Sequence, residues 1–393
     1  MKQLVDWGKA ETRQMRRFSR RKALGVVVGL VGGVGLASCA HHDQSSVVEP
    51  PMTRQGSLRR LARVLVSPER VIRTVVGLRP FRPSGFVVRA EKLDDKLLIH
   101  NYGHGGGGVT LSWGTSQLAV EDVSSSGLSG SAAVLGCGAV GLATARLLQR
   151  HGFDVTIYAR DIPPNTTSNV AGASWFPTAV VEAGRRTVRF DSQFERAARL
   201  SHRYFQELVG PKYGVHWREQ YFLTDEVGPE PWEYVMLRDL FPGPRQLGRG
   251  EHPFGVRYAL VDNMMFIEPP VYLAALLDDF RLAGGRLVVR ALQEARQLAA
   301  LPEAVVMNCT GLGSKELFGD EELLPDTGQL TVLLPQPEVD YAMVMNDEVY
   351  MFPRQDGILL GGTHERGVST LEPNVEAQRR IVAEHQRIFD RMR

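Results

Sequence analysis

A glycine loop between an apolar strand and a helix-forming run constrains the fold of this chain more than any other feature. The apolar residues 132–135 lead into Gly136-Cys137-Gly138-Ala139-Val140-Gly141, a helix is predicted over 142–150, and a second strand over 154–158. This order is required by a dinucleotide-binding fold: the first glycine permits a tight turn, the second lets backbone approach a diphosphate, and the third lets helix pack on strand. The sequence therefore predicts an α/β protein that holds a diphosphate at the N-terminus of this helix.

The end of the second strand offers groups for a ribose and for phosphates. An acidic residue is expected there to bind the adenosine ribose, and Asp161 is the candidate, although Arg160 stands one step earlier and could instead lie near a phosphate. The hydroxyl-rich segment that follows can bond to phosphates and admit a flat ring, but it also suits an ordinary Ser/Thr turn. Its candidates are Thr166, Thr167, Ser168 and Gly172.

Residues 304–308 form another apolar run that leads into a glycine turn. Its position far along the chain predicts a parallel strand that returns to the nucleotide-binding sheet. Cys137 and Cys309 both fall in turns at strand ends, where a buried free thiol is expected. The sequence leaves open whether these two cysteines pair.

The most informative stretch is His100-Asn101-Tyr102-Gly103-His104-Gly105-Gly106-Gly107-Gly108, which an apolar strand enters and a helix-like segment leaves. Consecutive glycines suit a place where a ligand touches the main chain. The spacing of His100 and His104 would suit zinc on a helix, but the intervening Asn-Tyr-Gly and the following glycines argue against a helix. We therefore expect no metal site here.

This stretch resembles the signature of the D-amino acid oxidase family of flavoproteins. The likeness runs from about residue 71 to residue 393 through Gly77-Leu78-Arg79-Pro80-Phe81-Arg82-Pro83, Asn308-Cys309-Thr310-Gly311, Gly328-Gln329-Leu330, Tyr350-Met351-Phe352-Pro353-Arg354 and Gly361-Gly362-Thr363. The resemblance implies an α/β fold with an FAD-binding Rossmann-like domain and a mixed-sheet substrate domain.

The order of these motifs differs from that of the family. There the glycine-loop strand opens the chain and the Leu-Arg-Pro and His-Asn-Tyr-Gly-His segments close it, whereas here the closing segments come first. We interpret this order as a circular permutation whose join is the Ser/Gly segment 124–131. The alternative is that the first segment is an extra, partial duplicate.

The resemblance implies that FAD and a zwitterionic D-amino acid are bound. The carboxylate-binding arginine falls on Arg79, the adjoining active-site tyrosine on Tyr350, and the carbonyl that accepts the substrate amine on Gly106. A second tyrosine of the vertebrate enzymes falls on Asn346, which leaves lid closure and substrate size open. Arg354 matches a position that we expect to support structure.

The cofactor contacts implied by the resemblance extend over both glycine-rich segments. A helix that begins near Val109 would direct its positive end at the flavin pyrimidine. The implied cofactor-binding residues are Gly136, Gly138, Ala139, Val140, Gly141, Arg160, Asp161, Thr166, Thr167, Ser168, Gly172, Gly311, Gly105, Gly106, Gly108, Val109 and Thr110.

The reaction implied is oxidative deamination. With carboxylate and amine fixed, the substrate would lose hydride to flavin N5, and the imino acid would hydrolyse to a 2-oxo acid and ammonia. Oxygen would reoxidise the flavin and give hydrogen peroxide. The alternatives are a related flavin amine or amino acid dehydrogenase that passes electrons to a membrane acceptor, and a non-catalytic flavin-binding lipoprotein.

The N-terminus resembles a bacterial export signal. Ser19-Arg20-Arg21-Lys22-Ala23-Leu24 is similar to the twin-arginine motif, with Ala23 where phenylalanine is usual, and Leu36-Ala37-Ser38-Cys39 is similar to a lipobox. The resemblance implies export of the folded protein, cleavage before Cys39, lipid on its sulfur and a location at the cell envelope. An uncut N-terminal anchor helix is the alternative.

Charge supports a separate leader, because residues 1–38 carry eight Lys or Arg and two Asp or Glu in a chain of net charge +2. That small net charge gives no reason to expect a nucleic-acid partner, and the oligomeric state is open. The expected organisation is a signal (1–38), a tether (39–70) with a weak amphipathic helix at 57–66, and a catalytic unit (71–393) divided into an FAD module (97–180 and 296–325) and a substrate module (71–96, 181–295 and 326–393).

Overall fold

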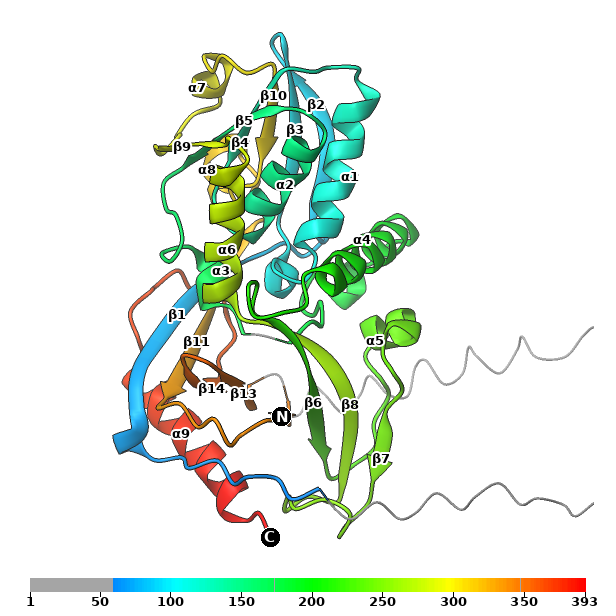
Figure 1. The fold of residues 1–393 in the computed structure, drawn as a ribbon, viewed down its shortest axis with the longest axis vertical. Coiled ribbons are helices and arrows are strands. Elements are labelled where there is room, and N and C mark those ends of the chain that lie inside the picture. Colours follow the sequence, from blue (N-terminus) through cyan, green and yellow to red (C-terminus); the bar gives the residue numbers. More distant parts are fainter. Residues whose placement is uncertain (1–58, 173, 347) are drawn as a thin grey trace, which may run out of the picture. The chain divides into compact units, whose positions relative to one another are not determined.

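The computed structural model describes residues 59–393 apart from Ala173 and Asp347. The predicted signal, most of the tether and Cys39 lie outside the described residues. The described chain is built on a six-stranded and a nine-stranded sheet (Figure 1). Within these residues no helix combines the length and the apolar character needed to cross a membrane.

The six-stranded sheet has the order β2-β3-β10-β4-β5-β9, in which all neighbours are parallel except β2 and β3. The glycine-loop strand β4 lies beside β10, which confirms the predicted return of residues 304–308 to this sheet. The strands are β2 (Val87–Leu93), β3 (Lys96–Tyr102), β4 (Ser131–Leu135), β5 (Asp154–Ala159), β9 (Arg286–Val289) and β10 (Val305–Asn308).

Both faces of this sheet are covered, as its continuous apolar strands require. Successive residues of a strand point to opposite faces. Val134 of β4 thus joins the core under α1 and α2, whereas Leu135 packs with Leu298 of α7 and Leu317 of α8. The helices are α1 (Ser112–Ser125), α2 (Ala139–Arg150), α3 (Thr167–Val170), α4 (Val188–Glu207), α5 (Trp232–Leu237), α6 (Pro269–Leu282), α7 (Ala295–Ala299), α8 (Gly313–Phe318) and α9 (Val375–Asp390).

The nine-stranded sheet has the order β1-β11-β14-β13-β12-β6-β8-β7, with β15 also paired to β11. β1 pairs with β11 and β6 pairs with β8, both in antiparallel register. The last helix of the chain, α9, packs on this sheet, and the side chain of Asn374 caps its N-terminus. The strands are β1 (Val71–Phe81), β6 (Val215–Thr224), β7 (Arg245–Leu247), β8 (Tyr258–Ile267), β11 (Leu324–Leu333), β12 (Ala342–Val344), β13 (Tyr350–Arg354), β14 (Gly357–Gly361) and β15 (Glu365–Arg366).

Two strands lie outside the module expected for them. β2 pairs with β3 and β9 pairs with β5, so both belong to the nucleotide-binding sheet rather than to the substrate module. Residues 87–93 are all half-buried or exposed because β2 is an edge strand, and this pattern differs from that of the buried parallel strands.

The residues just before β1 are part of the folded unit, and the helix expected at 57–66 is absent from its described part, 59–66. Leu61, Val64 and Val66 are buried in the core that includes Tyr341. The backbone of Leu65 exchanges two hydrogen bonds with the side chain of Gln336 (N to Oε1 2.7 Å, Nε2 to O 3.1 Å), so partners elsewhere in the fold replace those of a helix.

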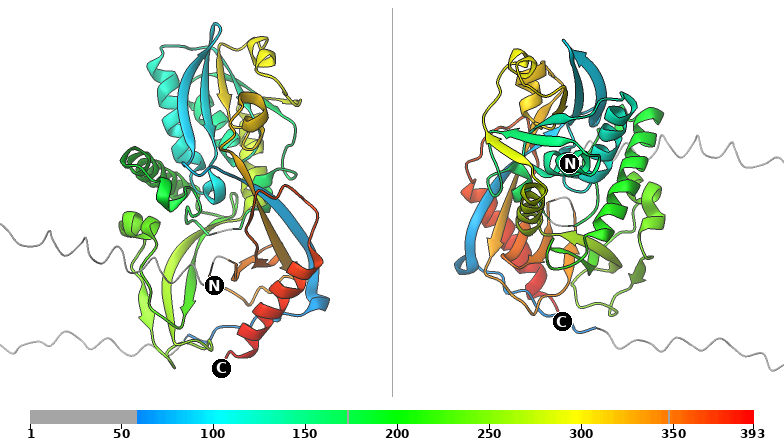
Figure 2. Two further views of the ribbon diagram at one scale, coloured as in Figure 1. Left: turned by 180° about the vertical axis from the view of Figure 1, so that it is seen from behind. Right: turned by 45° about the horizontal axis from the view of Figure 1, so that its top comes forward.

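This first folded segment lies beside the end of α9 (Figure 2). Arg63 forms an ion pair with Asp390, and the hydroxyl of Tyr341 donates to the carbonyl of Ala62 at 2.9 Å and contacts Met392 Sδ at 3.6 Å. The two ends of the described chain are therefore neighbours. At the join that the permutation predicts, residues 126–130 form a short exposed connection between α1 and β4.

Candidate active site

A cleft of about 1690 Å³ opens where the carboxyl ends of β3, β4, β5 and β10 meet β1, β11 and β13 of the other sheet. This edge of a parallel sheet is the usual place for a ligand, because strand ends and helix N-termini converge there. Nearly every residue predicted to touch a cofactor or substrate lines this cleft, and Gly141 is the exception.

The glycine loop has the geometry expected for a diphosphate. Gly136 has φ +102°, a value favourable only to glycine, and its N–H donates to the carbonyl of Tyr158 at 2.8 Å. A Cβ at Gly141 would lie 2.1 Å from the carbonyl oxygen of Gly136, so this glycine serves helix packing, which explains why it does not line the cleft. The N–H of Ala139, at the start of α2, donates to Ser168 Oγ at 3.0 Å. The first N–H group of α2 thus donates to an oxygen atom of a residue that lines the cleft.

The two candidates at the end of β5 lie together at the edge of the cleft. Arg160 Nε is 2.7 Å from Asp161 Oδ2, and their side chains are 79% and 45% exposed. Both are accessible to the ribose and phosphate end of a dinucleotide, and each carries the counter-charge of the other.

The hydroxyl-rich segment after β5 also borders the cleft. Thr166 Oγ1 donates to Asn169 Oδ1 at 2.7 Å, while Thr167 begins α3. Arg354 holds the end of this segment in place. Its Nη1 donates to the carbonyl of Ala171 at 3.2 Å and lies 3.5 Å from the carbonyl oxygen of Gly172. The guanidinium of Arg354 is buried and paired with Asp356, which agrees with the supporting role expected for it.

The signature loop turns more tightly than expected before its helix begins. Gly105–Gly107 form a 3-10 turn, and α1 starts at Ser112, three residues after Val109. The extra turn is held by Thr110, whose hydroxyl donates to the carbonyl of Gly107 at 3.2 Å and whose own carbonyl accepts from Trp175 Nε1 at 3.1 Å. The turn keeps Val109 and Thr110 in the cleft wall.

Gly106 is exposed and lines the cleft together with the segment before α4 that it contacts. Its N–H donates to the carbonyl of Ala179 at 3.2 Å, and a Cβ there would lie 2.7 Å from the carbonyl oxygen of Thr178. The loop therefore presents main chain, without a side chain, to whatever occupies the cleft.

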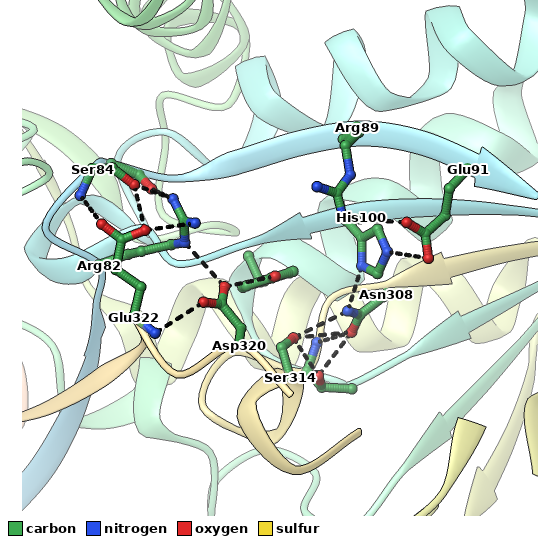
Figure 3. Close-up of polar contacts among 12 residues, drawn as sticks. Arg82, Ser84, Arg89, Glu91, His100, Asn308, Ser314, Asp320 and Glu322 are labelled. Carbon is green, nitrogen blue, oxygen red and sulfur yellow. Dashed lines mark hydrogen bonds and ion pairs between the residues drawn. The ribbon is translucent and has the colours of Figure 1, made fainter. Parts of the chain in front are cut away.

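The two histidines of the signature occupy separate environments. His100 lies on β3 between Glu91 and Asn308, with Nε2 3.1 Å from Glu91 Oε1 and Nδ1 accepting from Asn308 Nδ2 at 3.0 Å (Figure 3). His104 stacks on Phe86, and its burial lowers the pKa of its imidazole to about 3. Within the described residues, no three His, Cys, Asp or Glu side chains are placed to share a metal ion.

Asn308 connects this network to the turn after β10. Its Oδ1 accepts from the N–H of Thr310 at 3.2 Å and from the Thr310 hydroxyl at 2.7 Å, and its Nδ2 donates to Ser314 Oγ at 3.0 Å. These bonds fix the turn that brings Gly311 to the cleft.

Asp320 joins the ends of two strands from different sheets. It accepts from Arg82 Nε, just beyond β1, at 3.0 Å (Figure 3). It also accepts from the hydroxyl of Tyr102, at the end of β3, at 2.8 Å. Burial alone would raise the pKa of this carboxyl, but the hydrogen bonds from Tyr102 and Arg82 outweigh it and the pKa falls below its usual value. The strand of Arg79 is thereby held beside the signature loop.

Arg79 projects from β1 into the cleft. Its Nη1 lies 3.3 Å from the carbonyl of Thr363, 3.3 Å from His364 Nδ1 and 3.8 Å from Asp326 Oδ1. The guanidinium lies over Gly328 of β11, where no side chain competes for the space.

Tyr350 lies over a second glycine of the same sheet. Its ring covers Gly361, its direct partner on β14, and stacks on Phe352 with a centroid distance of 5.0 Å. The nearby Asn346, in the place of the second tyrosine, uses its Oδ1 to accept from the N–H groups of Glu348 and Val349, and so closes its own turn.

Strand register places Arg79 and Tyr350 on the same face. Gly361 pairs with Leu330, which stands two residues after Gly328 on β11 and so shares its face. The guanidinium over Gly328 and the phenol over Gly361 thus lie on the adjacent strands β11 and β14, and they are offset by two residues along the strands. Two hydrogen-bonding side chains converge there, as the binding of one carboxylate requires.

The pair Asp326 and His364 behind the guanidinium was not predicted. His364 directly follows the Gly361-Gly362-Thr363 motif, and Asp326 stands two residues before Gly328. Their positions in the sequence, next to two of the family motifs, are the only indication of a role that the sequence offers. Strand register is needed to show that the two side chains meet.

The thiols of Cys137 and Cys309 are free and buried, as predicted. Burial raises the pKa of each to about 12, so neither is a thiolate nucleophile at neutral pH.

Comparison with known proteins gives one consistent family. The sequence model of the "FAD dependent oxidoreductase" family matches residues 16–121 and 131–392. The D-amino-acid oxidase of Rubrobacter xylanophilus is 34% identical over 258 residues, which cover 62% of this chain and 72% of the relative. That of Dictyostelium discoideum is 31% identical over 239 residues, or 59% and 65% of the two chains.

Among solved structures, glycine oxidase from Geobacillus kaustophilus superposes with a TM-score of 0.51 at 16% sequence identity, over 66% of this chain and 79% of that one. The likeness concerns the fold. It agrees with the expected combination of a Rossmann-like sheet and a mixed sheet.

Proposed function

Since the chain belongs to the family of FAD-dependent oxidoreductases, we propose that it oxidatively deaminates D-amino acids to 2-oxo acids. The observation that carries the proposal is the convergence of Arg79 and Tyr350 on one face of β11 and β14, in a cleft that the main chain of the signature glycines also lines. The names of the two relatives support this choice of substrate.

The residues of the cleft fit FAD. The positive φ of Gly136, the side-chain-free Gly106 and the donor at Ala139 make a cradle that a Cβ added at either glycine would distort. The diphosphate would lie at the start of α2, the ribose near Asp161, and the ring system against residues 105–110. FAD, when bound, supplies a hydride acceptor that oxygen can reoxidise.

The residues of the chain would act by binding and orienting the substrate. The guanidinium of Arg79 suits a two-point contact with its carboxylate, and the hydroxyl of Tyr350 can donate to the same group. The carbonyl of Gly106 would accept from the amine. Three fixed points orient the Cα–H bond, and orientation of this kind supplies a large part of the rate acceleration.

The test uses protein that lacks residues 1–38, purified with FAD. Anaerobic addition of D-alanine should bleach the yellow flavin, L-alanine should leave it unchanged, and air should restore the colour rapidly. Bleaching by the L-isomer alone would contradict the proposal, and so would the absence of bleaching by either isomer in a panel of about twenty amino acids. Slow recovery in air would instead indicate a dehydrogenase that passes its electrons to another acceptor.

We also propose that the fold is circularly permuted. The short exposed connection 126–130 joins α1 to β4, residues 59–66 lie beside the end of α9, and the family match is interrupted between residues 121 and 131. A variant opened in this connection, with residue 393 linked to residue 59, should fold, bind FAD and retain its activity. An unfolded product with several different linkers would contradict the proposal.

For the N-terminus we propose twin-arginine export and lipidation of Cys39, on the sequence motifs alone. Export in a bacterial host should stop when Arg20 and Arg21 are both replaced by lysine. Cys39→Ser should abolish labelling by radioactive palmitate and release the protein from the membrane fraction. Labelling that persists in Cys39→Ser would contradict the lipid site.

A further inference from the structure

We infer that Asp326 and His364 form a positioning pair that holds the Arg79 guanidinium in its substrate-binding orientation. The inference rests on the proposed function, because it assigns these two residues to the same carboxylate clamp. Neither residue needs to touch the substrate in this role.

Asp326 is placed centrally by strand register. It is the direct partner of Arg79 on β1 and of Arg366 on β15, so the three side chains form one row across three strands. Side chains of directly paired residues share a face. The carboxylate is 1% exposed and lies between two cationic side chains.

Burial alone would raise the pKa of Asp326, but His364, Arg79 and Arg366 outweigh it and the pKa falls below its usual value. The carboxylate is therefore ionised and can only accept hydrogen bonds. His364 Nδ1 lies 3.1 Å from its Oδ2, so this nitrogen carries the proton and donates to Asp326.

This assignment decides how Arg79 is held. A guanidinium can only donate, so Nη1 has no acceptor at a protonated Nδ1 and bonds instead to the carbonyl of Thr363 at 3.3 Å. Asp326 fixes His364, His364 fixes the adjoining peptide, and the carbonyl of that peptide binds Arg79.

A second contact attracts the same nitrogen of the guanidinium. Asp326 Oδ1 is buried without a hydrogen-bond donor among the described residues, and it lies 3.8 Å from Arg79 Nη1. A buried carboxylate oxygen without a donor attracts the nearest cation strongly. Both of these contacts involve Nη1, so they fix one edge of the guanidinium and leave the rest of the fork for a ligand.

The test compares three replacements of His364, whose side chain is 30% exposed and therefore tolerant of change. His364→Asn keeps a donor nitrogen at the position of Nδ1, His364→Gln moves it outward, and His364→Leu removes it. The readouts are FAD content, KM and kcat for D-alanine, and the dissociation constant of benzoate, a carboxylate without an amine, measured from the flavin spectrum.

We expect His364→Asn to stay within about threefold of the wild type. His364→Leu and His364→Gln should raise both KM and the benzoate dissociation constant by about tenfold or more, with kcat within about threefold and full FAD content, because carboxylate binding is weakened equally in the ground and transition states. Equal behaviour of the Asn and Leu variants would overturn the inference.

Dependence on Arg79 gives a second criterion. In an Arg79→Ala background, His364→Leu should cause no further loss of benzoate affinity, because the residue through which it acts is gone. An additive loss would overturn the inference and would indicate direct contact with the ligand. Failure of the proposed function is distinguishable, since a wild type that no D-amino acid reduces can still show the predicted pattern of benzoate binding.

Discussion

The guanidinium of Arg79 rests on the backbone of Gly328, so closely that a Cβ at residue 328 would lie 2.4 Å from Nη2. The Gly328-Gln329-Leu330 motif therefore requires glycine at its first position. The side chain of Arg79 on β1 lies over this glycine, and any larger residue there would occupy the place of the guanidinium.

Gly328→Ala should displace Arg79 while the rest of β11 stays paired. We expect KM for a D-amino acid to rise by about tenfold or more while FAD content is retained, because the lost interaction is with the substrate carboxylate. Gly184→Ala is the matched control, since a Cβ there meets nothing within 4 Å. Steady-state kinetics and the flavin absorbance of both proteins decide the question, and equal KM values would contradict this account of the motif.

Replacement of Arg79 itself separates charge from geometry. Arg79→Lys keeps the charge but loses the two-point fork, whereas Arg79→Ala loses both. We expect the Ala variant to lose about 2–4 kcal/mol of substrate binding and the Lys variant a smaller amount, with normal FAD content in both. Titration with benzoate measures the loss directly, and unchanged turnover of Arg79→Ala would remove this residue from the clamp.

Gly141→Ala tests the cofactor cradle rather than the substrate site. The added Cβ would lie 2.1 Å from the carbonyl oxygen of Gly136, a main-chain atom that cannot move without opening the glycine turn. We expect loss of FAD on purification and a decrease of about 1–3 kcal/mol in the free energy of unfolding. Gly228→Ala, in open space, should leave both unchanged. Full FAD content in Gly141→Ala would show that the helix can shift without cost.

The nucleotide-binding half of the fold was predictable because its parallel strands are buried on both faces. Val134 and Met307 lie in continuous apolar runs, and glycine turns follow at both strand ends. The edge strand β2 gave no such signal. The start of α1 was misjudged because a hydrogen bond from Trp175, 65 residues away, stabilises the extra turn at Thr110.

Site residues that stand in a sequence motif could be predicted. Those that strand pairing alone brings into the site could not. Arg79 and Tyr350 stand in recognisable motifs. Asp326 meets His364 because β11 pairs with β15, and it meets Arg79 because β11 pairs with β1. No local pattern in the sequence contains this register.

The response to acid should depend on buried histidines that take no part in the reaction. His202 of α4 is buried with its ring against Trp175 at 4.6 Å, and burial lowers its pKa to about 4. In the unfolded chain an imidazole titrates near pH 6.5. Between these two values the unfolded state binds the proton and the folded state does not, so the free energy of unfolding falls as the pH falls.

His202→Phe keeps a ring against Trp175 and removes this titration. Between pH 6.5 and pH 4 we expect the free energy of unfolding of the variant to fall less steeply than that of the wild type, by up to about 1.4 kcal/mol per pH unit, and the two curves should run parallel below pH 4. Urea titrations at half-unit steps of pH measure this difference. His216, whose pKa burial also lowers to about 4, remains in the variant, so part of the acid sensitivity should persist. Identical slopes for the two proteins would mean that His202 becomes protonated without unfolding of the chain.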